Sequence, residues 1–79
     1  MTEKQQIEKV ALEVFSRERL KWVIASIEEN LPAHTWDIEV EVPDGHELMF
    51  PVPKGSLREM KESIRNFTEE EMDRLSSHR

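Results

Sequence analysis

WDIEVEVPDGHELMFPV, residues 36–52, carries the clearest structural signal in the chain. Acidic and apolar residues alternate along its first half, which is typical of a strand with one buried and one exposed face. At its centre, Pro43 suits the second position of a type I turn, and Gly45 suits the positive-φ position of a three-residue loop. The segment therefore predicts an antiparallel β-hairpin with strands at about 36–42 and 46–52.

The register of this hairpin depends on the length of its loop. A two-residue Asp-Gly loop would set acidic residues of the first strand opposite Leu48 and Phe50, which splits the apolar face. A shift of one residue turns every side chain to the other face, so only one register keeps the apolar residues together. With the three-residue loop, the apolar residues pair across the strands: Val40 with Leu48, Ile38 with Phe50, and Trp36 with Val52.

The favoured register gathers negative charge on the outer side of the hairpin. The acidic residues there are Asp37, Glu39, Glu41 and Glu47, and the apolar Met49 lies among them. An apolar side chain surrounded by carboxylates is a candidate anchor for a partner. We therefore predict that these five residues form a partner-binding surface.

Two apolar stripes at helical spacing precede the hairpin. The first contains Ile7, Val10, Ala11, Val14 and Phe15. The second contains Leu20, Val23, Ile24, Ile27 and Leu31, on nearly the opposite side of a continuous helix. Thr2 and Gln5 form a capping box at the start, and Pro32 ends the pattern. The pattern predicts one long N-terminal helix, or two short helices with a break near Ser16.

A further helical segment follows the hairpin. Ser56 and Glu59 form a second capping box, and Thr68 begins a third. The apolar stripe contains Leu57, Met60, Ile64, Phe67, Met72 and Leu75. The sequence therefore predicts a single C-terminal helix, or a helix pair at about 57–66 and 69–76.

This order of elements predicts an α+β fold in which residues 1–79 form a single small domain. The chain has 79 residues, 37% of them hydrophobic and 35% charged, so its core is thin for a folded unit. It has no cysteine for a disulfide or a thiolate zinc site. A lone hairpin also keeps two unpaired edges. We therefore expect a homodimer or a stable complex with another chain.

The location of the protein is predicted from its hydropathy. The N-terminal segment MTEKQQIEKV lacks the apolar stretch of a signal peptide. The longest apolar run, Trp22 to Ala25, is four residues, whereas a membrane-spanning helix needs about 20. We expect a cytoplasmic protein that does not contact a membrane.

Direct binding to nucleic acid is not expected. The formal net charge of −6 repels phosphate groups and anionic lipids. Arg58, Lys61 and Arg65 could form a basic patch on the C-terminal helical segment. Glu59 and Glu62 alternate with these residues and dilute the patch.

No residue pattern in the chain specifies a reaction. Glu39 and Glu41 lie two apart on a strand, about 7 Å, which could suit an acid and a base. A flat exposed sheet does not provide the dry pocket that shifts a catalytic pKa. His34 and His46 lie near aspartates, but without the spacing of a metal site. We expect no enzymatic activity, no catalytic residue, no cofactor and no metal.

The distribution of charge along the chain is the strongest functional signal. Residues 22–53 contain seven acidic residues and no lysine or arginine, so all eleven basic residues lie in the flanking segments. A one-sided field of this kind steers a positively charged partner. We expect a non-enzymatic regulatory protein that binds a basic surface, by analogy with phage or mobile-element inhibitors that mimic nucleic acid. The alternatives are an accessory subunit completed by a larger complex, or acidic strands that only prevent aggregation.

Overall fold

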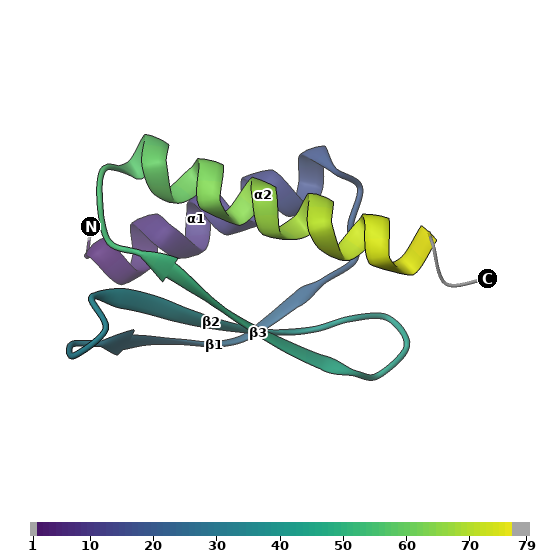
Figure 1. Cartoon of the computed structure of the whole chain (residues 1–79), viewed down its shortest axis with the longest axis horizontal. Coiled ribbons are helices and arrows are strands. Elements are labelled where there is room, and N and C mark those ends of the chain that lie inside the picture. Colours follow the sequence, from purple (N-terminus) through teal and green to yellow (C-terminus); the bar gives the residue numbers. More distant parts are fainter. Residues whose placement is uncertain (1, 77–79) are drawn as a thin grey trace.

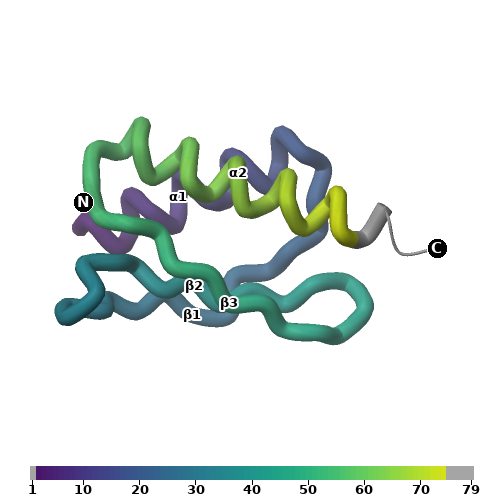
Figure 2. The backbone as a smooth tube through the Cα atoms, viewed as in Figure 1, coloured from purple at the N-terminus to yellow at the C-terminus, as the bar shows by residue number. Residues whose placement is uncertain are grey.

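The computed structural model describes residues 2–76 of the chain, with side chains up to Arg74. A three-stranded antiparallel sheet, in the order β1-β2-β3, carries two helices on one of its faces (Figure 1). The elements are α1 (Glu3–Arg17), β1 (Val23–Asn30), β2 (Thr35–Glu41), β3 (Glu47–Pro53) and α2 (Leu57–Ser76). Figure 2 follows the chain from α1 through the three strands and back across them as α2. The predicted α+β class, with an N-terminal helix, a hairpin and a C-terminal helix, is confirmed.

The hairpin forms in the predicted register. Ile38 pairs with Phe50 at its centre, with the other predicted apolar pairs on either side. The Val42 N–H donates to the His46 carbonyl at 2.9 Å, and the Gly45 N–H donates to the Val42 carbonyl at 2.9 Å. Gly45 has φ +93°, a conformation that a side chain would strain. The three-residue loop is therefore confirmed.

The prediction that helical structure continues to Leu31 is wrong, because residues 23–30 form strand β1. α1 ends at Arg17, and Arg19 turns the chain away with φ +58°. The ladder between β1 and β2 contains a β-bulge between Ile24 and Ser26. The bulge adds one residue, so the inward-facing Ile24 and Ile27 are three apart instead of two. Three-residue spacing is also typical of a helix face, which explains the error.

The C-terminal segment is a single helix, α2, so the predicted alternative of a helix pair is wrong. The buried Thr68 does not cap a new helix, because its hydroxyl donates to the Arg65 carbonyl at 2.7 Å within the same helix. The first turn does have the predicted capping box: the Glu59 N–H donates to Ser56 Oγ, and the Ser56 N–H donates to Glu59 Oε1. The side chain of Leu75, part of the predicted stripe, lies outside the described residues.

The core lies between the inner face of the sheet and the two helices. Stacked rings of Phe50 from β3 and Phe67 from α2, 4.0 Å apart, join the sheet to the second helix. Trp22, just before β1, lies between Phe15 of α1 and Phe67, with ring centroids 5.4 and 6.4 Å away. At the other end, Trp36 Nε1 donates to Glu3 Oε1 at 2.9 Å and holds the start of α1 against the sheet. The helices therefore cover one face of the sheet and leave the other exposed.

Candidate functional site

The outer face of the sheet, on the side away from the helices, carries the candidate site. Side chains alternate along each strand, and paired residues share a face. On β2 and β3 the outward residues include Asp37, Glu39, Glu41, Glu47 and Met49. Glu41 is paired with Glu47, and Glu39 with Met49. The register therefore brings all five residues of the predicted partner-binding surface to one side of the molecule.

β1 extends this surface beyond the hairpin. Glu28 is paired with Asp37, and Val23 with Glu41, so both β1 residues also face outward. These two residues are not among the predicted site residues, because the sequence pattern of this segment predicts a helix. The β-branched residues Val23, Ile24 and Ile27 were the available signal for a strand. With Glu28 included, the outer face holds five carboxylates.

The carboxylates on the outer face repel one another. Glu47 is the main reason that the pKa of the Glu39 carboxyl group lies above its usual range: a side-chain hydrogen bond between the two, which favours the protonated form, contributes most, and charge repulsion follows. Partial desolvation and the charge of Glu28 raise it further. The strands, all of which the structure describes, contain no lysine or arginine that would relieve this repulsion. A cation supplied from outside would do so.

Asp37 differs from the other acidic residues of the outer face. Its carboxylate accepts hydrogen bonds from Thr35 Oγ1 at 2.9 Å and from Asn30 Nδ2 at 3.2 Å. Asn30 Oδ1 in turn accepts from the Ala33 N–H at 3.2 Å. This network fixes the turn between β1 and β2, so the Asp37 carboxylate is already used in holding the fold together.

Two apolar side chains interrupt the charged surface. Met49 is 63% exposed and Val23 is 64% exposed, and they lie on the two edge strands of the sheet. Among the described residues nothing covers either of them. A flexible, polarisable methionine is well suited to an adaptable contact with another protein.

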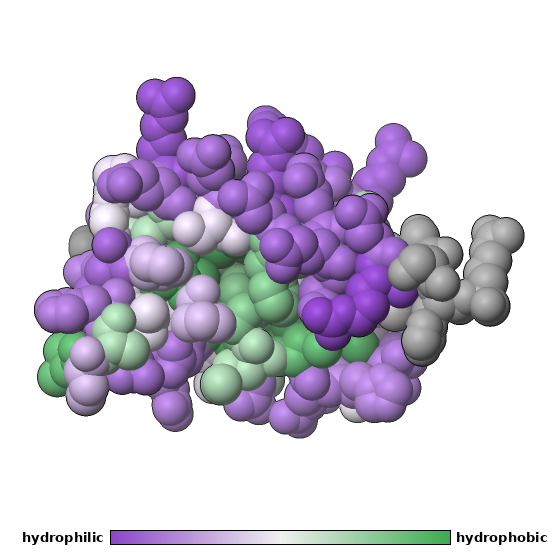
Figure 3. Space-filling model, in the orientation of Figure 1, coloured by the Kyte–Doolittle hydropathy of each residue, from purple (hydrophilic) through white to green (hydrophobic). Residues whose placement is uncertain are grey.

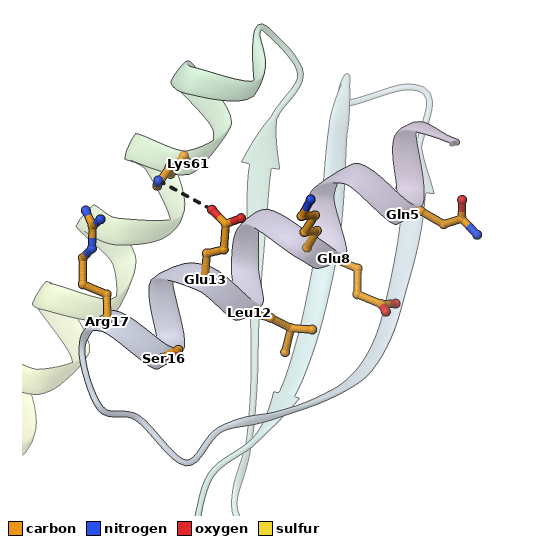
Figure 4. Close-up of a pocket in the computed structure, with 8 residues that line it drawn as sticks. Gln5, Glu8, Leu12, Glu13, Ser16, Arg17 and Lys61 are labelled. Atoms are coloured by element: carbon orange, nitrogen blue, oxygen red, sulfur yellow. Dashed lines mark ion pairs between the residues drawn. The ribbon is translucent and has the colours of Figure 1, made fainter.

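The helical side of the molecule is charged but mixed in sign. Hydrophilic side chains cover the upper, helical part of the view in Figure 3. In the groove between the helices, Lys61 lies 3.7 Å from Glu13 (Figure 4), and Arg65 lies 3.4 Å from Glu69. Two members of the basic patch considered in the sequence analysis are therefore paired with carboxylates.

The histidines near aspartates do not form a chelating cluster. His46 Nδ1 lies 2.9 Å from Asp44 Oδ2, and both side chains are largely exposed. The His46 backbone N–H, which donates to Asp44 Oδ1, lowers the pKa of Asp44. Within residues 2–76, no three acidic or histidine side chains lie close enough together to hold a metal ion.

Neither helix in the described part of the chain is long and apolar enough to cross a membrane. Comparison of the chain with models of protein families, with curated proteins and with solved structures finds no match.

Proposed function

We propose that this chain is a small interaction protein that binds a basic surface of a partner protein through the outer face of its sheet. Glu28, Glu39, Glu41 and Glu47 supply the charge, and Met49 supplies an apolar anchor. The observation that carries the proposal is the crowding of these carboxylates without a single cation on the strands. The raised pKa of Glu39 supports it: after the hydrogen bond with Glu47, the charges of Glu47 and Glu28 contribute to this shift, and a partner cation would relieve that repulsion.

The proposal assigns separate roles to charge and to apolar contact. Long-range attraction speeds the encounter and orients the partner, and added salt screens this attraction. The contact of Met49 with the partner is insensitive to salt. The partner is a protein whose own ligand is an anion, which includes proteins that bind nucleic acid, so binding here regulates or inhibits it.

The experiment is an affinity capture from host lysate with two matched double variants. Glu39→Gln/Glu41→Gln removes two charges from the outer face. Glu62→Gln/Glu70→Gln removes two charges from exposed positions on α2. Both change the formal net charge from −6 to −4, since each glutamate carries one negative charge. A difference between them therefore reports the place of the charge and not its total.

The proposal expects a partner that is lost in high salt and with the outer-face variant, and that is retained by the helix-face variant. Retention by both variants in high salt would overturn it. Equal loss with both variants would also overturn it, because the net charge would then be the cause. Circular dichroism of each variant confirms that the fold is intact.

A second function is supported by a different observation. Leu12 is 47% exposed on α1 and Val23 is 64% exposed on β1, near the open edge of the sheet. We propose as the alternative an accessory subunit or homodimer that covers this apolar surface. It expects association that persists in high salt. Sedimentation of the purified chain at two ionic strengths distinguishes it, because a monomer at both would exclude the homodimer.

A further inference from the structure

We propose that the open edge of β1 accepts an extended segment of the partner as a fourth strand, with basic residues alternating with apolar ones. This inference rests on the proposed function, since it names the part of the basic partner that docks. Three features carry it: β3 has a blocked edge, β1 has a free one, and β1 has acidic side chains on its outer face and a largely apolar groove beside its start on the inner face.

The edge of β3 is closed to pairing by two prolines. Val42 and His46 are a hydrogen-bonded pair, because the Val42 N–H donates to the His46 carbonyl. Along an antiparallel hairpin, hydrogen-bonded pairs alternate with pairs that are not hydrogen-bonded. Pro51 and Pro53 therefore belong to pairs that are not hydrogen-bonded, so their backbone groups point away from β2, toward the free edge. Proline has no N–H, so this half of β3 cannot donate to an added strand.

The edge of β1 keeps its hydrogen-bonding groups. Every second residue of β2 forms backbone hydrogen bonds with β3, and the residues between them bond to β1. Their partners on β1 are Ser26, Glu28 and Asn30. The N–H and C=O groups of Ile27 and Glu29 therefore point away from the sheet. Among the described residues, no backbone group pairs with them. Strand addition needs such a row of unpaired groups.

The chemistry on the two sides of β1 selects the added segment. On the outer side, a residue opposite Glu28 would place its side chain within cross-strand reach of that carboxylate. Glu28 is also close enough to Glu39 to raise its pKa, so a lysine or arginine here meets more than one negative charge. On the outer side of this edge, a basic residue is therefore favoured.

On the inner side, a groove of about 330 Å³ runs between α1 and the start of β1. Leu12, Trp22, Val23 and Ile24 line it together with Glu8. Figure 4 shows Leu12 and Glu8 pointing away from α2, which leaves this flank of α1 uncovered by the second helix. An apolar side chain at the end of the added segment, where it runs past the bulge toward the start of β1, would enter this groove.

A second copy of the chain fits this edge less well than a basic partner. Its own β1 would bring a second Glu28 to an outer surface that is already acidic, with no basic residue on the strand. The bulge between Ile24 and Ser26 also limits regular pairing to the second half of β1. The occupant is therefore a short segment and carries positive charge.

The test uses a capped eight-residue peptide of alternating lysine and valine as the probe. Two further peptides carry backbone N-methyl groups on all the lysines or on all the valines. In an added strand, only one of these two sets points its N–H groups at β1. Affinity is measured by titration, and amide hydrogen exchange of the protein is followed at Ile27 and Glu29.

We expect the peptide methylated on the valines to bind at least about tenfold more weakly than the parent peptide, because the residues opposite Ile27 and Glu29 make the main-chain hydrogen bonds. A loss with the lysine-methylated peptide instead would contradict the placement of lysine opposite Glu28. The other should bind like the parent, and exchange at Ile27 and Glu29 should slow with the parent. If both methylated peptides bind equally to the parent, the peptide is held by charge alone and strand addition is refuted. A dimer that protects these amides without peptide would also refute it. The proposed function fails separately, if parent binding is as strong with Glu39→Gln/Glu41→Gln as with Glu62→Gln/Glu70→Gln.

Discussion

Substitutions in β1 distinguish a strand from a helix, because the two structures bury different residues. A helix through this segment would bury Val23, Ile27 and Leu31 together on one stripe. In the structure, Ile27 of β1 is 3% exposed, whereas Val23 at its start is 64% exposed and Leu31, just after its end, is 65% exposed. The strand therefore predicts one costly position and two tolerant ones.

The expected magnitudes follow from burial. Ile27→Ala should lower the free energy of unfolding by about 2–5 kcal/mol, from lost transfer energy and the cavity left behind. A domain of 79 residues has roughly 4–12 kcal/mol in total, so at the lower end of this range the variant would be close to unfolding. The milder Ile27→Val should cost about 0.5–1.5 kcal/mol and remain folded. Val23→Thr and Leu31→Gln should change stability by no more than about 0.5 kcal/mol.

Urea unfolding measures these differences through the fluorescence of the buried Trp22 and Trp36. With a slope of about 1 kcal/mol per molar urea for so small a domain, Ile27→Ala should lower the midpoint by roughly 2 M or more. Ile27→Val should lower it by about 1 M, and the two exposed substitutions should hardly move it. A loss at Val23 or Leu31 as large as the loss from Ile27→Ala would refute the strand and restore the helix.

Three further predictions follow from the fold and the outer face. Gly45→Ala should lower the free energy of unfolding in urea by about 1–3 kcal/mol, because alanine is strained at φ +93°. No heavy atom lies within 4 Å of the added Cβ, so the loss would come from the backbone alone, and an unchanged midpoint would contradict it. Trp36→Phe and Glu3→Ala should show a coupling of about 1 kcal/mol in a double-mutant cycle, and additive losses would mean that their 2.9 Å hydrogen bond contributes nothing. Glu39→Gln should raise the urea midpoint at neutral pH, since a raised pKa means that ionisation of Glu39 costs folding energy. That gain should vanish as the pH falls through the Glu39 pKa, and a gain that persists in acid would have another cause.

The hairpin could be predicted because its signals are local. The alternation of acidic and apolar residues around Ile38, and the Pro43-Asp44-Gly45 turn, lie within one short segment. β1 could not be predicted in the same way. Its inward residues are separated by a bulge, and a bulge is visible only once the strand is paired with β2.

The residues of the candidate site likewise fall into those that the local sequence predicts and those that depend on the pairing of β1. The acidic residues of β2 and β3, together with Met49, share a face by virtue of the hairpin register alone. Glu28 joins them through the pairing of β1 with β2, which brings Glu28 opposite Asp37, nine positions away in the chain. The structural use of Asp37, as acceptor for Asn30 and Thr35, is likewise a consequence of that pairing.

The third strand, β1, removes part of the reason for expecting a homodimer. The expectation of a homodimer rested on a thin core and on a lone hairpin with two free edges. β1 covers the edge of β2 and adds Ile27 to the core, while Pro51 and Pro53 interrupt the edge of β3. One regular edge remains, and it borders a surface on which Glu28 and its neighbours repel one another. A copy of the same acidic strand would increase this repulsion, whereas a basic strand would relieve it, so under the proposed function a basic protein is a better match for this edge than a second copy.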